Sequence, residues 1–247
     1  MTQEYRQNNS VAPLRNVVAL AELIASVQDR GPGLPGLGVF HGWSGFGKTT
    51  AAVWAANRFR AYQVEVKSAW TKKKFCTEVL KDMGVTPEKT VADMVDQIAV
   101  ELVRNDRPLI IDEVDYLVDR NMIEIVRDIH ESSGATIILI GEEKLPQKLI
   151  AWERVHGRVL SWVAAQEGQL EDVGFLSNIY CPGVRLTDEM KTLVLEGSRR
   201  SIRRISINLE AVKSFALTRN LKEVGLKDWG DTPLFTGLAP KARNLPK

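Results

Sequence analysis

The segment Gly42-Trp-Ser-Gly-Phe-Gly-Lys-Thr49 carries the most specific structural signal in the chain. It matches the pattern GxxxxGK[ST], follows the apolar residues Val39 and Phe40, and runs into the helical stretch Thr50–Arg60. Between a strand and a helix, glycines let backbone N–H groups approach phosphate oxygens, and the start of the helix adds the positive end of a dipole. The sequence therefore predicts a P-loop that binds a nucleoside triphosphate.

Individual side chains of this loop have separate expected roles. Lys48 is the point charge for the β- and γ-phosphates, and the Thr49 hydroxyl is a ligand for Mg²⁺. Trp43 and Phe46 occupy variable positions, where packing of the loop is the preferred interpretation. The residues expected to hold the nucleotide are Gly42, Ser44, Gly45, Gly47, Lys48, Thr49, Thr50 and, from the next motif, Asp112.

A second motif is the string Leu109-Ile-Ile-Asp-Glu113, an apolar strand that ends in two acids. We expect the strand to deliver Asp112 to the edge of the sheet, where it binds or orients Mg²⁺, and Glu113 to polarise a water for attack on the γ-phosphate. Acids often end strands, so this string becomes specific only in combination with the P-loop. Asp115 and Tyr116 continue the loop and are equally consistent with a solvated turn.

Short apolar runs alternate with amphipathic stretches over the first two thirds of the chain. The expected strands are Val39–Phe40, 62–67, 108–112, 135–140 and 160–164. The expected helices between them are 14–29, 50–60, 72–83, 122–130 and one that starts at Thr86-Pro87. This alternation predicts an α/β fold with a parallel sheet sandwiched by helices.

The domain organisation follows from where the strand signal stops. Helical stretches at 169–181, 187–196 and 199–219 predict a small all-helical lid domain. The expected division is a flexible lead at 1–12, a P-loop domain at 13–168, a helical domain at 169–224 and an irregular tail at 225–247.

Charge and composition limit the possible partners. Lys plus Arg is 33 against 31 for Asp plus Glu, a net charge of +2, so any nucleic-acid surface must be local. The two cysteines show no metal-ligand spacing, and a polar start without a secretory signal favours the cytoplasm.

The motifs at 42–49 and 112–115 (DEVD) resemble those of the AAA+ ATPases. Within these, the chain is similar to the group of the phage Mu B transposition protein, over roughly residues 10–222. The narrower similarity rests on the Asn16 region, the strings DEVDYL and IGEEKLPQKL, and a Gly-Ser-Arg-Arg run. It implies an oligomeric, ATP- and Mg²⁺-dependent DNA-binding regulator that brings target DNA to a transposase. The N-terminal helical DNA-binding domain of the Mu B protein itself has no counterpart here.

The resemblance also assigns roles to residues outside the two motifs. Glu142 takes the place of a polar sensor that is usually Asn, Ser or Thr; it either turns aside to stabilise a loop or helps position the water. Arg158, with Arg154 second, matches the arginine that reaches the γ-phosphate of a neighbouring subunit, although either could be an ordinary surface residue. Arg200 matches sensor 2, which reaches from the helical domain to the nucleotide.

Basic side chains concentrate at two places. Residues 198–222 hold seven basic residues against one acid, a local charge of +6. Such patches bind the phosphate backbone of duplex DNA without reading its sequence, although a solvated helix start explains them as well. The candidate DNA contacts are Lys72, Lys73, Lys74, Arg199, Arg203 and Arg204.

Two functions from different classes remain open at this point. The first is an ATP-dependent DNA-binding oligomer, a ring or a filament, that activates a transposase. The second is an AAA+ loader or secretion-type ATPase that acts on a protein partner. A P-loop kinase fits less well, because no lid rich in arginine is evident.

Overall fold

The computed structural model describes residues 14–238, so the expected flexible lead at 1–12 and the end of the tail at 239–247 lie outside the described residues. The chain divides into two units, and the first comprises Arg15–Gln166. The second begins at Glu167 and also includes Leu14. The division therefore falls two residues before the expected one. Within the described part, no helix has the length and apolar character needed to cross a membrane.

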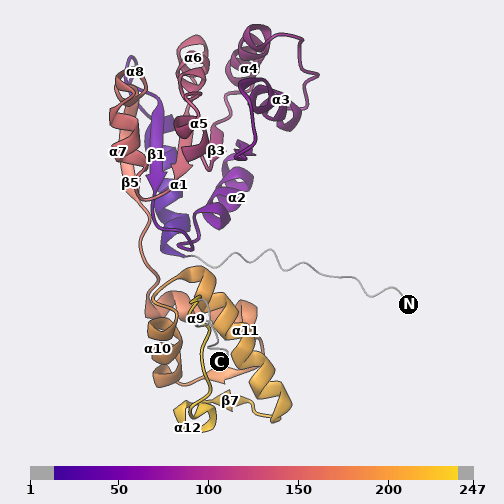
Figure 1. Ribbon diagram of the computed structural model, residues 1–247, viewed down its shortest axis with the longest axis vertical. Helices are drawn as coiled ribbons and strands as arrows, with labels where there is room; N and C mark the ends of the chain where they lie inside the picture. The colour runs from indigo at the N-terminus through magenta and orange to yellow at the C-terminus, as the bar shows by residue number, and fades with distance from the viewer. Residues whose placement is uncertain (1–13, 239–247) are drawn as a thin grey trace, which may run out of the picture. The chain divides into compact units, whose positions relative to one another are not determined.

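A five-stranded parallel sheet forms the centre of the first unit (Figure 1). Its strands are β1 (Leu37–His41), β2 (Tyr62–Glu65), β3 (Leu109–Asp112), β4 (Ile137–Gly141) and β5 (Val159–Ala164). Their order across the sheet is β2-β3-β4-β1-β5, and every neighbouring pair is parallel. The predicted α/β fold is confirmed. Because all strands run the same way, the loops that follow β1, β3 and β4 leave from one edge of the sheet.

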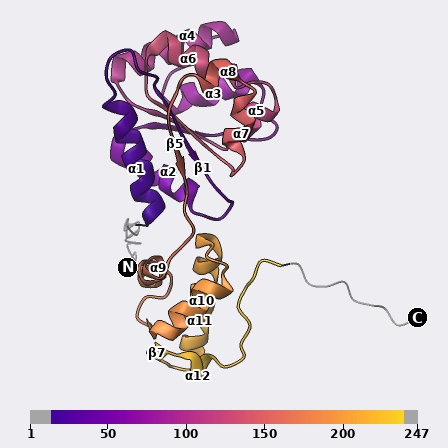
Figure 2. The same ribbon diagram turned by 90° about the vertical axis from the view of Figure 1, so that its left-hand side faces the viewer.

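Helices cover both faces of this sheet (Figures 1 and 2). One face carries α1 (Arg15–Gln28) and α2 (Lys48–Phe59). The other carries α3 (Lys72–Asp82), α4 (Val91–Asn105), α5 (Asp115–Asp119), α6 (Glu124–Ser133), α7 (Leu145–Ile150) and α8 (Glu153–His156). The strands are apolar on both sides, as a sheet covered twice requires.

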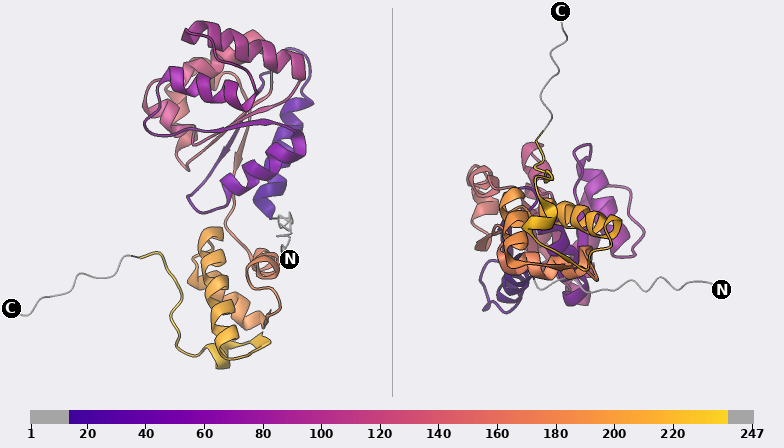
Figure 3. Two further views of the ribbon diagram at one scale, coloured as in Figure 1. Left: turned by 90° about the vertical axis from the view of Figure 1, so that its right-hand side faces the viewer. Right: turned by 90° about the horizontal axis from the view of Figure 1, so that it is seen from below.

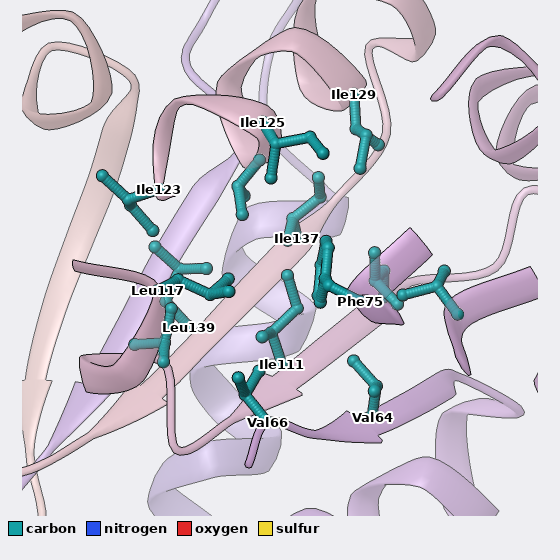
Figure 4. Close-up of a cluster of buried hydrophobic side chains, with 14 of the residues drawn as sticks. Val64, Val66, Phe75, Ile111, Leu117, Ile123, Ile125, Ile129, Ile137 and Leu139 are labelled. Carbon is teal, nitrogen blue, oxygen red and sulfur yellow. The ribbon is translucent and has the colours of Figure 1, made fainter. Parts of the chain in front are cut away.

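The core on the second face is the larger hydrophobic cluster of the first unit (Figure 4). Alternate residues of the strands point into it and meet side chains from the covering helices. Its labelled members are Val64, Val66, Phe75, Ile111, Leu117, Ile123, Ile125, Ile129, Ile137 and Leu139. Burial of each such side chain contributes roughly 1.5–3 kcal/mol to the free energy of folding, so this cluster contributes strongly to the stability of the sheet.

Some helices differ from those expected. α4 begins at Val91 rather than at Thr86-Pro87, because the Thr90 hydroxyl caps it by accepting the Asp93 N–H at 3.1 Å. No sequence pattern predicts α5, α7 and α8, since helices of four to six residues are too short to show a 3.6-residue period.

The second unit is mainly helical, as predicted (Figure 3). It contains α9 (Leu170–Tyr180), α10 (Asp188–Gly197), α11 (Ile202–Thr218) and α12 (Leu226–Trp229). Two short strands, β6 (Arg185–Leu186) and β7 (Glu223–Val224), pair in parallel. The expectation of an irregular tail from 225 is therefore wrong in its first part: α12 forms there.

The residues of α12 and the segment after it are held by specific contacts. The ring of Trp229 is buried and lies 4.8 Å from that of Phe215 in α11. Further along, the side chain of Asn208 accepts the Phe235 N–H at 2.7 Å and donates to the Phe235 carbonyl at 3.1 Å. The buried Trp229 ring and the Asn208 amide thus hold a segment in a defined conformation, although its Gly/Pro-rich composition predicts an irregular one.

Candidate nucleotide-binding site

The P-loop connects the end of β1 to the start of α2. Gly45 and Gly47 have φ values of 88° and 83°, in the left-handed region that glycine adopts without strain. A Cβ atom on Gly42 would lie 2.7 Å from Cβ of Ala165, so a larger residue does not fit there. Ser44 lies between these glycines, and Thr49 and Thr50 follow in the first turn of α2. The loop therefore has the tight conformation that its glycines predict.

The Lys48 side chain folds back over this loop and is only 9% exposed. Its Nζ atom donates to the carbonyl oxygens of Gly42 at 2.6 Å and Trp43 at 3.1 Å. Burial lowers the pKa of Lys48, while the carboxylates of Glu113 and Asp112 act in the opposite direction. The ammonium group thus lies between the loop and the acids that follow β3. Trp43 is itself 60% exposed, so its interpretation as a packing residue is wrong.

Asp112 ends β3 with a carboxylate that is 1% exposed. Its Oδ1 atom accepts the Glu113 N–H at 2.9 Å, and its buried Oδ2 atom has no hydrogen-bond partner among the described residues. Burial raises the pKa of Asp112, and the nearby Thr49 hydroxyl opposes that shift. An unpaired carboxylate oxygen beside a hydroxyl is the hard oxygen environment that Mg²⁺ prefers.

The two residues fit a magnesium ion that is held mainly by the nucleotide. Over residues 14–238 there is no group of three or more His, Cys, Asp or Glu side chains that could bind a metal alone. Mg²⁺ at phosphate sites keeps waters and phosphate oxygens as most of its ligands, so one carboxylate and one hydroxyl are sufficient. Thr49 and Asp112 would hold the ion here.

Glu113 follows directly and has a φ of 56°, which is unusual for a residue with a side chain. This conformation costs on the order of 1 kcal/mol and persists only where the surroundings impose it. Here the Val114 N–H donates to the Ile140 carbonyl at 3.0 Å, which fixes the turn. Burial, followed by the Asp112 charge, raises the pKa of Glu113, whereas Lys48 lowers it. A carboxylate with these neighbours is suited to accept a proton from water.

Asp115 is a site residue that the sequence alone does not identify. It is 5% exposed, so its interpretation as a solvated turn is wrong. Its Oδ2 atom accepts the Glu142 N–H at 2.7 Å, and its Oδ1 atom pairs with Lys148 Nζ at 2.9 Å. A Cβ on Gly141 would come within 2.3 Å of the same carboxylate. Asp115 therefore fixes the backbone at the end of β4. Its place as the last acid of the DEVD string is its only sequence signal.

Glu142 lies just beyond β4, at the edge where the P-loop and Glu113 also lie. Its carboxylate is close enough to act electrostatically on both Lys48 and Glu113. The negative charge of Glu142 acts to raise the pKa of each of these residues. Its backbone meanwhile anchors the loop through Asp115. The structure thus brings together Lys48, Asp112, Glu113 and Glu142, with Thr49 beside them.

The two candidate arginines lie outside this cluster. Arg158 directly precedes β5, so it lies at the edge of the sheet opposite the P-loop, and its Nε atom donates to Glu131 at 2.8 Å. Arg200 belongs to the second unit, where it pairs with Glu196 at 2.9 Å and Glu167 at 3.0 Å. Glu196 raises the pKa of Arg200. Neither arginine belongs to the P-loop cluster itself.

The basic candidates for DNA contact form two exposed groups. Lys72, Lys73 and Lys74 open α3, where Lys74 pairs with Glu78 at 2.8 Å. Arg199 and Arg203 are exposed and Arg204 is partly exposed, around the start of α11.

Several charges of the 198–222 segment are engaged locally. Lys213 pairs with Glu210 at 3.0 Å, and Arg219 stacks 3.8 Å over the ring of Phe215. Arg200 is balanced by two glutamates outside the segment. The local field is therefore weaker than the +6 counted from the sequence.

Comparison with known proteins defines the class of this domain. Residues 33–149, which include both motifs, match the family model described as AAA domain. A search of curated proteins finds no match. With the P-loop, the acidic strand end and the parallel sheet, this segment is an AAA-type P-loop ATPase domain.

Solved structures with a similar fold include ORC and Cdc6 proteins. They include the ORC2 protein of Aeropyrum pernix in its ADP form (TM-score 0.62, 13% identity, 90% of this chain and 69% of that one). For the ORC1 protein of Aeropyrum pernix in complex with DNA, the TM-score is 0.60 at 18% identity, and the match covers 86% of this chain and 62% of that one. For Cdc6p from Pyrobaculum aerophilum, the TM-score is 0.61 at 12% identity, and the match covers 92% of this chain and 68% of that one. The chain thus has an AAA+ fold similar to these proteins, and it spans about two thirds of their length.

Proposed function

We propose that this protein is a Mg²⁺-dependent ATPase that binds duplex DNA without sequence preference, oligomerises on it and delivers it to a transposase. The observation that carries the proposal is the cluster at one sheet edge: Lys48 under the P-loop, the unpaired Asp112 oxygen beside Thr49, and the half-buried Glu113. On the resemblance to the Mu B group, we place it in the cytoplasm of a bacterial host and regard it as phage-encoded.

The proposed reaction is hydrolysis of ATP to ADP and phosphate. Lys48 binds the β- and γ-phosphate oxygens together with the P-loop glycines, and Thr49 and Asp112 hold Mg²⁺, which neutralises charge on the phosphates. Glu113 accepts the proton of the attacking water, a role favoured by its raised pKa and its position beside Lys48. Glu142 orients that water or the loop that faces it.

The proposed DNA contacts are two separate basic groups, one around the start of α3 in the first unit and one around the start of α11 in the second. The positive charge of an arginine at a helix start is repelled by the positive end of the helix dipole. An anionic partner such as a DNA phosphate would offset this repulsion. The fold is shared with a protein solved in complex with DNA, the ORC1 protein of Aeropyrum pernix, which supports this assignment. Contacts to phosphates alone would give binding that falls steeply with salt.

Arg158 and Arg200 complete the proposed machinery. Since Arg158 lies at the sheet edge opposite its own P-loop, it can act only on a nucleotide bound by another copy of the chain. Arg200 would exchange its two glutamates for the γ-phosphate when the helical unit closes. The Arg158 role makes hydrolysis depend on assembly, and the Arg200 role makes it depend on closure of the helical unit.

The test is the ATPase rate with and without duplex DNA, at low and at high salt. We expect stimulation by DNA that disappears at high salt, together with DNA-bound assemblies visible by electron microscopy only when ATP is present. Absence of adenine nucleotide binding with magnesium would refute the whole proposal.

A protein partner in place of DNA is the second candidate. α9 presents several large apolar side chains that are about 40% exposed: Leu170, Phe175, Ile179 and Tyr180. Such a surface suits a loader or secretion-type ATPase that docks on another protein. ATPase activity that is unaffected by DNA and insensitive to salt would favour this alternative.

A further inference from the structure

Asn16 is a buried polar residue of α1 whose amide bonds only to backbone groups. It is 5% exposed. Its Nδ2 atom donates to the carbonyl oxygens of Phe46 and Gln166, each at 2.8 Å, and its Oδ1 atom accepts the Gln166 N–H at 2.8 Å. Both amide hydrogens and the amide oxygen are therefore used.

The orientation of this amide follows from its partners. Two of the three partners are carbonyl oxygens, which require a donor, and the third is an N–H group, which requires an acceptor. The opposite orientation would place the amide oxygen against two carbonyls and the NH₂ group against the N–H. Only the observed arrangement satisfies all three contacts.

The two backbone segments that Asn16 joins have different positions in the chain. Phe46 lies in the P-loop, two residues before Lys48. Gln166 is the last residue of the first unit, so the chain passes directly from it into the helical unit at Glu167. One side chain from α1 thus connects the phosphate-binding loop to the segment that leads into the second unit.

The other end of the P-loop contacts the same segment. The Ala165 N–H donates to the His41 carbonyl at 2.6 Å, and Gly42 approaches Ala165 so closely that a Cβ would overlap it. Ala165–Gln166 is therefore held against the start of the P-loop directly and against its end through Asn16. A change in the Phe46 peptide must strain one of these contacts or move the segment.

We propose that Asn16 is a positioning residue that transmits the state of the P-loop to Ala165–Gln166, and so to the segment from which the helical unit begins. It acts through Phe46 and contacts no reacting atom. The inference rests on the proposed nucleotide site, because nucleotide binding is the event that changes the P-loop.

The experiment compares hydrogen exchange at residues 165–167 of the full chain with and without ADP and a non-hydrolysable ATP analogue. In the wild type we expect nucleotide to change protection there. In Asn16→Ala, we expect nucleotide still to bind but its effect on protection to fall at least about 5-fold, the lower end of ordinary coupling between sites. Asn57→Ala is the matched control, since its exposed amide bonds only to Val53 of its own helix at 2.9 Å.

A second pair of variants tests the same link without touching Asn16. Gln166→Pro removes the N–H that Asn16 accepts, whereas Gln166→Ala keeps it, and the Gln166 side chain is exposed. We expect only the proline variant to lose the nucleotide effect. This pair decides the question if Asn16→Ala does not fold.

The outcomes separate this inference from the proposed function. Wild-type protein that binds no nucleotide overturns the proposed function. Two outcomes overturn the coupling role alone. In the first, wild-type protein binds nucleotide but its hydrogen exchange at 165–167 does not change. In the second, the nucleotide effect on exchange is undiminished in both Asn16→Ala and Gln166→Pro. Equal losses in Asn16→Ala and Asn57→Ala would also overturn it.

Discussion

Two adjacent acids at the end of β3 have distinct environments although they share one motif. Asp112 is almost fully buried with one oxygen unpaired beside Thr49, which suits a metal ligand. Glu113 is turned by its positive φ toward Lys48 and Glu142. The left-handed backbone at Glu113 ends the extended geometry of the strand, in which successive side chains point to opposite faces of the sheet.

Glu113→Gln tests the assignment of the general base. The amide cannot accept a proton, so we expect the rate of phosphate release in a single turnover to fall about 10²- to 10⁴-fold, with ATP affinity retained. Lys48→Ala should instead abolish nucleotide binding. Glu88→Gln, at an exposed position of the same unit, is the control and should leave both quantities unchanged. Normal turnover by Glu113→Gln would show that another group takes the proton.

His130 makes the stability of the first unit depend on pH. Its buried ring accepts the Gly36 N–H at Nε2 and bonds the Ala135 carbonyl through Nδ1, so the neutral form is favoured. Burial lowers the pKa of His130; Ala135 and Glu131 oppose this, and Arg30 and Arg158 reinforce it. The unfolded state, with a pKa of about 6.5, then takes up a proton more readily than the folded state.

The sign of the effect follows from that difference. The stabilisation by neutral His130 is complete above pH of about 6.5 and is lost as the pH falls toward the lowered folded pKa. We expect the free energy of unfolding, measured with urea, to decrease between pH 7.5 and 5.5 in the wild type. His130→Gln should flatten this dependence; an equal slope in the variant would assign it to other groups.

At the scale of elements, the start of α11 differs from an ordinary solvated helix start. Arg199 and Arg200 both have left-handed backbones, with φ of 48° and 55°, and the Arg200 carbonyl accepts the Gly168 N–H at 2.8 Å. This turn, rather than the helix itself, sets the direction of the arginine cluster. It also explains why charge counted along the sequence overstates the field: Arg200 is drawn to two glutamates that lie outside the counted segment.

Substitution at the start of α11 tests the proposed DNA surface. We expect Arg203→Ala and Arg204→Ala each to weaken binding of duplexes of any sequence and to reduce the slope of log affinity against log salt by about 1, as loss of one phosphate contact requires. Lys213→Ala is the matched control, because Lys213 is on the same helix but pairs with Glu210. Equal effects of all three substitutions would indicate a general charge effect without a defined surface.

At the scale of the whole molecule, one chain supplies the P-loop, Asp112 and Glu113 at one edge of its sheet and Arg158 at the opposite edge. In the proposed mechanism, the P-loop of one copy therefore acts together with Arg158 of another. Arg158 forms an exposed ion pair with Glu131 in the single chain, and exposed pairs contribute little stability, so exchange of Glu131 for a phosphate is inexpensive.

Mixing two inactive variants tests this arrangement. Lys48→Ala lacks a working nucleotide site but keeps Arg158, and Arg158→Ala keeps the site but lacks the arginine. We expect each alone to be inactive and the mixture to recover part of the ATPase activity, because the arginine of one copy completes the site of the other. Arg158→Ala should still bind ATP as isolated subunits. Full activity of Arg158→Ala by itself would remove the residue from the mechanism.

Four features follow from the sequence alone: the P-loop, the acidic strand end, the parallel sheet and the helical character of the second unit. Each is encoded locally: glycines at fixed spacing allow one loop conformation, and short apolar runs between amphipathic stretches have few ways to bury their surface. The match of residues 33–149 to an AAA domain follows from the same local patterns.

The pairing of the remaining polar residues, in contrast, is evident only from the folded chain. Asn16 meets a partner 150 positions away, and Asp115 meets Glu142 from the next strand. Arg200 pairs with Glu167, 33 positions before it. No periodicity or spacing records such pairs, because they depend on how segments that are distant in the sequence are brought together within each unit. The physical reason is that buried hydrogen bonds are selected by the completed packing, whereas loop and strand conformations are selected by neighbouring residues.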